Sequence, residues 1–147
     1  MDFADNPFAK LSNTNTGFQD NPFNDVLKNI EPVDIKNAKQ LMDNPPEDYA
    51  GKCQRFVEQA AYGKTGLEYS ANTAWQNAQN KVESLNGIKK GDLIYFSPNE
   101  SNDYDGHVGI YEGNGKFISA RDDGIKSDSI DNWRNQTNQI PLGYIPQ

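Results

Sequence analysis

Cysteine and histidine are almost missing from this sequence of 147 residues, which contains one of each, Cys53 and His107. A single cysteine excludes a disulfide within the chain and gives no indication of the redox compartment. Long apolar runs are missing too: no stretch reaches about 18 apolar residues, so we expect no membrane insertion. The N-terminus shows no basic region followed by an apolar one, so we expect no secretory signal peptide.

Positive charge is also scarce. The chain has 14 Lys and Arg residues against 21 Asp and Glu residues, a net charge of -7. This imbalance argues against binding to nucleic acid or to anionic membranes. Hydrophobic residues make up 35% of the chain and its mean hydropathy is -0.88, low for a wholly globular protein. Part of the chain is therefore expected to be loop or extended tail.

The composition changes near residue 45. Residues 1–45 are rich in Asn, Asp, Thr and Pro, and they contain a short repeat, FADNPF from Phe3 and FQDNPF from Phe18. Asn-Pro steps favour turns, so each repeat would present phenylalanine side chains. Two interpretations are open: a disordered leader, or a docking segment that binds a partner through these phenylalanines. Residues 46–147 are expected to form the folded domain.

Three segments show the apolar spacing of an amphipathic helix: residues 34–42, 53–62 and 70–86. Asp34 and Ser70 are the expected N-terminal caps of the first and third helices. Gly63 and Gly87 are the expected ends of the second and third.

Three shorter segments indicate strands: residues 93–97, 108–112 and 117–120. The glycine-rich turn between the last two predicts a hairpin. Helices first and an antiparallel sheet afterwards indicate an α+β fold.

Cys53 allows two interpretations. It continues the apolar face of its predicted helix, where a free cysteine is usually a small buried residue. It also lies in the first turn of that helix, where unpaired N–H groups and the helix dipole stabilise a thiolate. A nucleophilic cysteine needs an imidazole partner, which can be distant in sequence. His107 alone can fill that role, although a lone histidine is often just a polar residue at a sheet edge.

Three motifs together resemble the NlpC/p60 superfamily of papain-like cysteine peptidases and the related CHAP domains. They are GKCQRFV around Cys53, GDLIYFSP before the predicted hairpin, and GHVGIYEGNGKFISA around His107. The resemblance covers roughly residues 48–147. It implies a papain-like α+β fold in which N-terminal helices pack on a small antiparallel sheet, preceded here by an extended tail.

The same resemblance implies hydrolysis of an amide bond in bacterial peptidoglycan. The bond lies either within the stem peptide or between sugar and peptide, as for an N-acetylmuramoyl-L-alanine amidase. Carried over by position, Cys53 is the nucleophile and His107 the general base and acid. The Cys53 backbone N–H and one side chain, Tyr49 or Gln54, would stabilise the oxyanion.

The chain departs from the family pattern at two places. Many relatives have Asp-Cys-Ser-Gly at the nucleophile, whereas this chain has KCQR, closer to the CHAP style. Many relatives also carry a second polar residue, often histidine, twelve positions after the first histidine, where this chain has Ser119. Serine stabilises an imidazolium less than a carboxylate does. A second function therefore stays open, an inactive structural or binding component of a phage particle.

The register of the predicted hairpin decides which side chain faces His107. If the turn has two residues, Asp122 lies opposite His107. If it has three, Arg121 lies opposite and Ser119 is diagonal on the same face. The resemblance favours Ser119, whereas electrostatics favours Asp122.

A competing pattern lies in the acidic stretch of residues 100–105. The positions of a calcium loop would be filled by Ser101, Asp103, Asp105, Gly106 and Glu112. Pro98 precludes the regular helix that should precede such a loop, and the following residues indicate a strand. We therefore expect a solvated acidic loop at the rim of the active site, without a metal, and leave a looser metal site in residues 100–105 as the alternative. No cofactor is expected.

The acidic enzyme would be repelled by the anionic polymers of many cell walls. We therefore expect a tether or a carrier to bring it to the wall. Because no signal peptide is predicted, the enzyme would reach the bacterial cell wall either as part of a phage particle or through a holin. We expect the phage particle, with the enzyme in its tail or interior. Residues 1–45 would bind a phage tail or virion protein. Peptidoglycan is the expected substrate.

Overall fold

The computed structural model describes residues 30–147, so the phenylalanine repeat lies outside the described residues. The chain divides into two units, residues 1–31 and 32–147, and every element described below belongs to the second. This division falls earlier than the boundary predicted near residue 45. The reason is α4 (Val33–Asp43), whose Ile35 and Ala38 are buried in the core of the second unit.

The predicted helices exist with altered ends. α4 begins after Pro32 without a side-chain cap, so the prediction that Asp34 caps it is wrong; Asp34 lies buried in the first turn. α5 (Cys53–Tyr62) begins at the cysteine and ends, as predicted, at Gly63, which adopts the left-handed φ of 70°. Within residues 30–147 no helix is long and apolar enough to cross a membrane.

α6 (Ala71–Asn77) is much shorter than predicted. It begins at the predicted cap Ser70, whose side chain and Thr73 form a reciprocal capping box. The chain leaves the helix because Val82 exchanges two backbone hydrogen bonds with Tyr144, at 2.8 and 3.0 Å. A tertiary pairing thus replaces the helix that local periodicity predicts.

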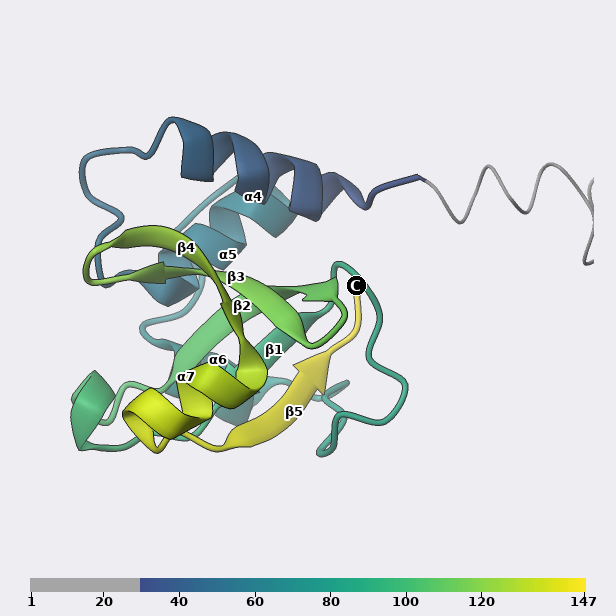
Figure 1. Ribbon diagram of the computed structural model, residues 1–147, viewed down its shortest axis with the longest axis vertical. Coiled ribbons are helices and arrows are strands. Elements are labelled where there is room, and N and C mark those ends of the chain that lie inside the picture. Colours follow the sequence, from purple (N-terminus) through teal and green to yellow (C-terminus); the bar gives the residue numbers. More distant parts are fainter. Residues whose placement is uncertain (1–29) are drawn as a thin grey trace, which may run out of the picture. The chain divides into compact units, whose positions relative to one another are not determined.

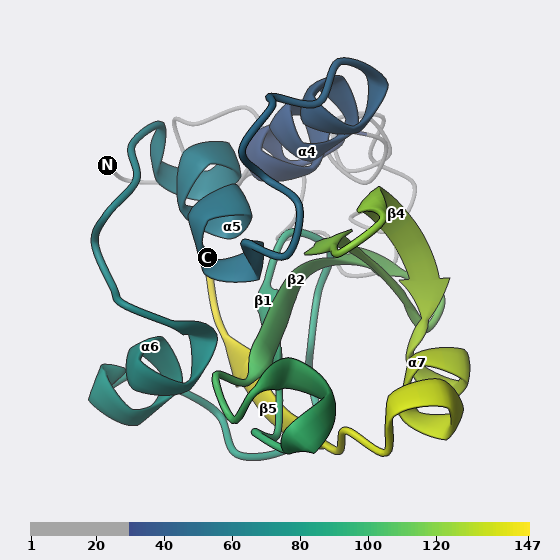
Figure 2. The ribbon, with the colours of Figure 1, turned by 90° about the vertical axis from the view of Figure 1, so that its left-hand side faces the viewer.

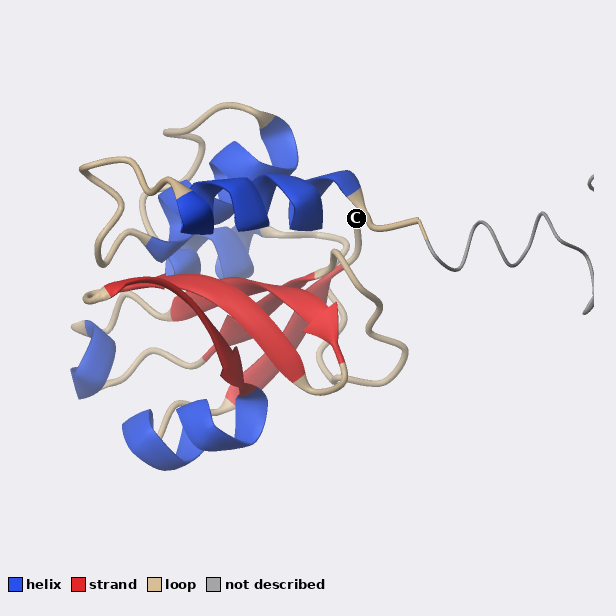
Figure 3. Ribbon diagram, turned by 45° about the horizontal axis from the view of Figure 1, so that its top comes forward, coloured by secondary structure: helices blue, strands red, loops and turns tan. Residues whose placement is uncertain are grey.

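A five-stranded antiparallel sheet follows, in the order β4-β3-β2-β1-β5. Its strands are β1 (Leu93–Phe96), β2 (His107–Gly113), β3 (Lys116–Arg121), β4 (Gly124–Ser129) and β5 (Pro141–Ile145). The α+β class is confirmed. α4 and α5 cover one face of the sheet, and α7 (Ile130–Thr137) lies on the other (Figures 1 and 2). Figure 3 shows the sheet between these two helical layers. The sequence did not predict β4, α7 or β5.

The two faces of the sheet pack into separate cores. Leu93 and Tyr95 of β1 enter a large cluster beneath the helices, whereas Ile94 and Phe96 enter a smaller one that contains Trp133 of α7. Burial of both faces explains why β1 reads as an unbroken apolar run. His107 and Ser119 belong to the face of the smaller cluster, because their strand neighbours point into the larger one.

The β2–β3 hairpin combines the two registers that the sequence left open. Gly113 pairs with Lys116 across a two-residue turn. A bulge between Tyr111 and Gly113 then shifts the ladder by one position, so Ile110 pairs with Ile118. Beyond the bulge the register is the one predicted for a three-residue turn.

Candidate active site

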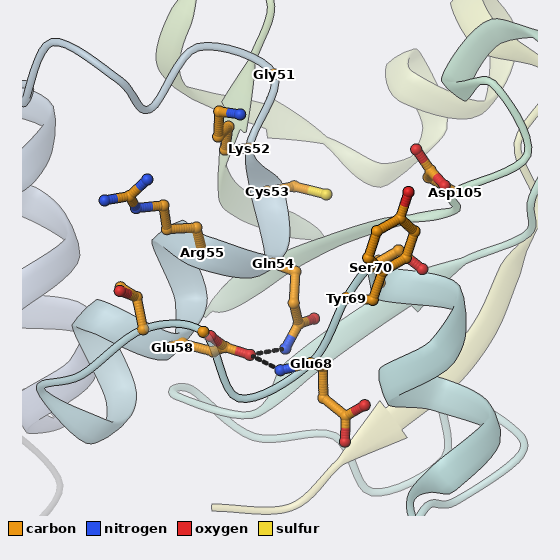
Figure 4. Close-up of a pocket in the computed structure, with 13 residues that line it drawn as sticks. Gly51, Lys52, Cys53, Gln54, Arg55, Glu58, Glu68, Tyr69, Ser70 and Asp105 are labelled. Atoms are coloured by element: carbon orange, nitrogen blue, oxygen red, sulfur yellow. Dashed lines mark hydrogen bonds between the residues drawn. The ribbon is translucent and has the colours of Figure 1, made fainter.

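Cys53 occupies the first position of α5, and its thiol is free. Phe56 and Val57 of the same helix are fully buried, so core packing fixes the helix end that carries the sulfur. Cys53 is partly exposed and borders two clefts. The first cleft lies toward the α5–α6 loop and the second toward His107. In Figure 4 the sulfur points into the first cleft, toward Tyr69 and Asp105.

Burial raises the pKa of the Cys53 thiol from 9.0 to about 11. The backbone N–H groups of Val108, Gln54 and Cys53 itself act in the opposite direction, because they hydrogen-bond the charged form. The Asp105 carboxylate raises the pKa further. The expectation that the helix N-terminus would produce a low thiol pKa is therefore wrong for the free protein, since desolvation outweighs the N–H groups.

His107 is the first residue of β2 and is buried. Its Nε2 atom lies 2.9 Å from Oγ of Ser119, which is itself inaccessible to solvent. The register explains the contact, because Ser119 faces Gly109 and is therefore diagonal to His107. Gly109 allows the close approach: a Cβ there would lie 3.1 Å from Cβ of Ser119 and 2.7 Å from the Ile118 carbonyl oxygen.

Aromatic rings surround the imidazole. Trp133 stacks on it with ring centroids 4.5 Å apart, and Phe96 and Phe117 lie at 6.0 and 6.2 Å. Burial lowers the pKa of His107 from 6.5 to about 3, and the positive charge of Arg121 contributes in the same direction. The free protein therefore holds a neutral imidazole and a protonated thiol at the border of one cleft.

A neutral imidazole and a neutral thiol define what the site can do. The imidazole can accept the thiol proton as the sulfur attacks, which is general-base activation rather than a preformed ion pair. Since Nε2 is bonded to Ser119, Nδ1 is the nitrogen left to accept that proton. For Nδ1 to be a base, Nε2 must carry the hydrogen and donate it to the Ser119 oxygen.

The first cleft has a volume of about 510 Å³, and Glu58 is one of the residues that line it. The Glu58 carboxylate is buried and accepts hydrogen bonds from the backbone N–H groups of Leu67 and Glu68, at 3.1 and 2.9 Å. It also accepts one from Nε2 of Gln54 at 3.0 Å (Figure 4). One carboxylate thus ties the loop that forms the wall of the cleft to α5.

The predicted oxyanion donors lie in different places. Gln54 borders the first cleft, but its amide is engaged by Glu58 and by the Tyr95 hydroxyl, which donates to its Oε1 at 3.2 Å. Tyr49 is buried in the core, with the Arg55 guanidinium over its ring at 5.4 Å, and it lines neither cleft.

Asp122, the electrostatic rival of Ser119, lies in the exposed turn between β3 and β4. Its carboxylate borders the second cleft and lies against Gly51, so close that a Cβ on Gly51 would come within 2.7 Å of Oδ1. Among the described residues, Ser119 is the side chain that hydrogen-bonds the His107 ring. The bulge accounts for this outcome, because it removes the register that would place Asp122 opposite His107.

The acidic stretch of residues 100–105 forms a short 3₁₀ helix, η1 (Glu100–Asn102), and a loop that leads into β2. Oδ1 of Asn102 accepts hydrogen bonds from the N–H groups of Asn99 and Gly106, at 3.0 and 3.1 Å. Within residues 30–147, no group of three His, Cys, Asp or Glu residues is arranged to hold a metal ion. The loop serves to deliver His107 to the start of its strand.

Trp133 is the main site residue that sequence reasoning missed. A signal existed: Ser129 caps α7 through the N–H of Asn132, and Ile130 and Trp133 are spaced for one helical face. Gln139, which accepts a hydrogen bond from the Trp133 indole, gave no such signal, because its role arises only from tertiary contacts.

Comparison with known proteins places this geometry in a family. The family model described as NlpC/P60 matches residues 49–141. The chain is 34% identical over 93 residues to peptidoglycan DL-endopeptidase CwlO of Bacillus licheniformis, covering 60% of this chain and 20% of that protein. It is 36% identical over 81 residues to the probable endopeptidase p60 of Listeria innocua, covering 53% of this chain and 16% of that protein. The chain thus spans about a fifth of these relatives.

Solved structures agree on the fold. The NlpC/p60 domain of peptidoglycan hydrolase SagA matches with a TM-score of 0.53 and 19% identity, covering 78% of this chain and 97% of that domain. A lipoprotein of the NLP/P60 family from Staphylococcus aureus matches with a TM-score of 0.53 and 21% identity, covering 78% and 41% of the two chains. The predicted fold is confirmed.

Proposed function

The chain belongs to the NlpC/P60 family, and from this premise we propose that it hydrolyses an amide bond of bacterial peptidoglycan by a Cys-His mechanism. One observation carries the proposal. The only cysteine and the only histidine, far apart in sequence, border the same cleft inside the matched region. The relatives named as endopeptidases support the same reaction class.

The proposed reaction begins when the Cys53 sulfur attacks the carbonyl carbon of the amide and Nδ1 of His107 takes the thiol proton. The carbonyl oxygen becomes an oxyanion, which the Cys53 backbone N–H at the helix start is placed to stabilise. His107 then gives the proton to the leaving amine, and a thioester remains on Cys53. Water, deprotonated by His107, then attacks the thioester, and the Cys53 sulfur leaves as the thiolate and takes the proton back from His107. The acid product loses its own proton to solvent and departs as the carboxylate.

In this mechanism the thiolate–imidazolium ion pair forms only when a substrate is attacked. The raised pKa of Cys53 and the lowered pKa of His107 both disfavour an ion pair in the free protein. An ion pair formed only as the sulfur attacks is stabilised in the transition state and not in the ground state. Ser119 keeps the His107 ring oriented for this step by accepting the hydrogen on Nε2.

The two clefts favour cleavage within a chain over removal of a terminal residue. Cys53 lies between them, and both are lined by polar and charged side chains suited to a peptide. A stem peptide that filled both clefts would place an internal amide bond over the sulfur. This supports an endopeptidase, with an amidase acting between sugar and peptide as the alternative bond specificity.

The decisive experiment compares the chain with Cys53→Ala and His107→Ala on purified peptidoglycans of several chemotypes. New amino groups are counted and the fragments are identified by mass, which reveals the bond. We expect activity in the chain and none in either variant. Equal activity in all three proteins would remove both residues from the mechanism. No activity on any wall would favour the second candidate, a phage component that keeps the fold without catalysis.

A finer proposal concerns delivery: a phage tail or virion protein binds the N-terminal segment and carries the enzyme to the wall. Its support is the repeated FxDNPF motif, which lies outside the described residues. Because α4 belongs to the folded unit, the docking segment would be confined to residues 1–31. We expect the full chain, but not a chain shortened by this segment, to copurify with phage particles. Equal copurification of both would refute the docking role.

A further inference from the structure

Trp133 is the largest side chain in contact with the imidazole of His107. The two rings are stacked, with centroids 4.5 Å apart and an angle of 25° between their planes. Trp133 is buried and comes from α7, on the sheet face opposite α5. It also borders the second cleft, as His107 does. The indole therefore stacks on one face of the base, while the other contacts come from Phe96 of β1 and from Phe117 and Ser119 of β3.

The indole is itself held in place. Its Nε1 donates a hydrogen bond of 2.8 Å to Oε1 of Gln139, a side chain that is 2% exposed. Nε2 of Gln139 donates in turn to Oγ of Ser101, also at 2.8 Å. α7 is anchored at its start, where the Ile130 N–H bonds the Gly115 carbonyl of the β2–β3 turn at 2.8 Å. Trp133 is thus fixed to the hairpin that carries His107 and to the loop that precedes it.

Arg121 adds a second contact to the indole. Its guanidinium carbon lies 5.6 Å from the centroid of the Trp133 ring. The guanidinium is paired with Asp128 at 2.8 Å and with Asp123 at 3.0 Å. These carboxylates hold the cation over the ring in a fixed geometry.

We propose that Trp133 is a positioning residue for His107, holding the imidazole in the one orientation in which Nε2 lies within hydrogen-bond distance of Oγ of Ser119 and Nδ1 is left as the basic nitrogen. The proposal rests on the general-base role of His107 in the proposed function. The physical need is clear: χ2 of histidine is broad, and a single hydrogen bond to a hydroxyl leaves the ring free to tilt. A stacked indole with its own hydrogen bond removes that freedom.

The stack also keeps water away from the imidazole. The charged and titratable groups that border the same cleft are Cys53 from α5, Asp103 and Asp105 from the loop before β2, and Arg121, Asp122 and Asp123 at the end of β3. Without the indole, water from this cleft would solvate the ring. Removing desolvation raises the histidine pKa toward its ordinary value.

The test uses ¹⁵N NMR of the whole chain, because its single histidine gives signals from His107 alone. The variants are Trp133→Phe, which keeps a stacked ring, and Trp133→Leu, which does not. Trp75→Leu is the matched control, since Trp75 is equally buried but packs on Tyr95 in the other core. The measured quantities are the tautomer and the titration of His107, followed by the pH profile of kcat/KM.

In the unaltered chain and in Trp133→Phe we expect one tautomer, with the hydrogen on Nε2, and no protonation near neutral pH. In Trp133→Leu we expect mixed tautomers, a pKa that rises toward 6.5, and an acid limb of kcat/KM that moves up with it. kcat/KM at neutral pH should fall by roughly tenfold to a hundredfold. Trp75→Leu should lower stability and leave tautomer and titration unchanged.

An unchanged tautomer and titration in Trp133→Leu would overturn the proposal, and so would equal changes in Trp75→Leu. If Trp133→Leu does not fold, Gln139→Ala decides the matter, because it frees the indole while keeping the ring. It should produce the same changes at smaller amplitude, and a spectrum identical to that of the unaltered chain would overturn the proposal. The spectra need no substrate, so they test the role of Trp133 even if the chain does not cleave peptidoglycan.

Discussion

The Nε2 atom of His107 lies 2.9 Å from Oγ of Ser119 on the neighbouring strand, although twelve residues separate them in sequence. A two-residue turn and a bulge between Tyr111 and Gly113 together produce this contact. The serine is neutral, so it orients the imidazole without supplying a charge to stabilise an imidazolium. The basicity of His107 therefore depends on its position and its burial. Ser119 mainly fixes the orientation of the imidazole ring.

Ser119→Ala should remove the hydrogen bond that orients the His107 ring. Nε2 would lose its partner inside a buried site, the tautomer with the hydrogen on Nδ1 would compete, and kcat should fall about 10- to 100-fold. Stability should fall by about 1 to 2 kcal/mol. Kinetics on purified peptidoglycan and thermal unfolding measure the two effects. Ser84→Ala, at an exposed loop position, is the control, and equal kinetics in both variants would contradict the role of Ser119.

The thiol pKa predicts slow alkylation at neutral pH. Because burial raises the pKa of Cys53 to about 11, the thiolate fraction grows as pH rises toward that value. We expect the rate with iodoacetamide to rise about tenfold per pH unit between pH 7 and 10. Asp105→Asn should shift the curve to lower pH, since that carboxylate raises the thiol pKa. A rate plateau reached below pH 8 would mean a preformed thiolate and contradict the neutral pair.

Glu58→Gln tests the carboxylate that holds the wall of the first cleft. The amide NH₂ of glutamine would face N–H donors from Leu67 and Glu68, so at least one hydrogen bond is lost in a buried place. We expect a loss of about 1 to 3 kcal/mol in the free energy of unfolding. Limited proteolysis should cut the loop near Leu67 sooner than in the unaltered chain. Glu83→Gln, at an exposed position, should leave both properties unchanged.

Asp34 makes stability depend on pH. Burial raises the pKa of its carboxyl from 3.8 to about 6, Asp92 adds to the effect, and Oδ2 has no hydrogen-bond partner. The folded state thus holds a proton that the unfolded state releases, so stability falls as pH rises from about 4 to 6 and stays lower above that range. Asp34→Asn should stabilise the protein by about 1 to 3 kcal/mol at pH 7 and by little at pH 3.5.

Denaturant unfolding at several pH values measures this difference. Asp48→Asn, at an exposed position, is the matched control and should show no such pH dependence. A constant effect of Asp34→Asn from pH 3.5 to 7 would show that the carboxyl does not titrate in this range.

The sequence predicted what local chemistry controls. α5 was foreseen with its cysteine at the start and Gly63 at the end, because apolar spacing and a left-handed terminal residue are local signals. The hairpin was foreseen from its glycine-rich turn. The family resemblance supplied Ser119 as the partner of His107, and the structure brings these two side chains together.

Tertiary contacts decided what the sequence could not. The single-residue bulge at the end of β2 has no local signal, yet it selects Ser119 over Asp122. α6 stops early because Val82 pairs with Tyr144, far along the chain. The thiol pKa was misjudged because a helix N-terminus can be read from sequence, whereas desolvation of Cys53 depends on what packs around it.

The strand order gives the site a particular resistance to local opening. β2 and β3, which carry His107 and Ser119, are inner strands, and β4 and β5 form the edges. Backbone amides exchange with solvent first where a strand has a free side, so fraying should begin at β4 and β5. The hydrogen-bonded pair His107 and Ser119, on β2 and β3, should persist until the whole sheet unfolds. On slow heating, the catalytic geometry and the native fold should therefore disappear in one transition.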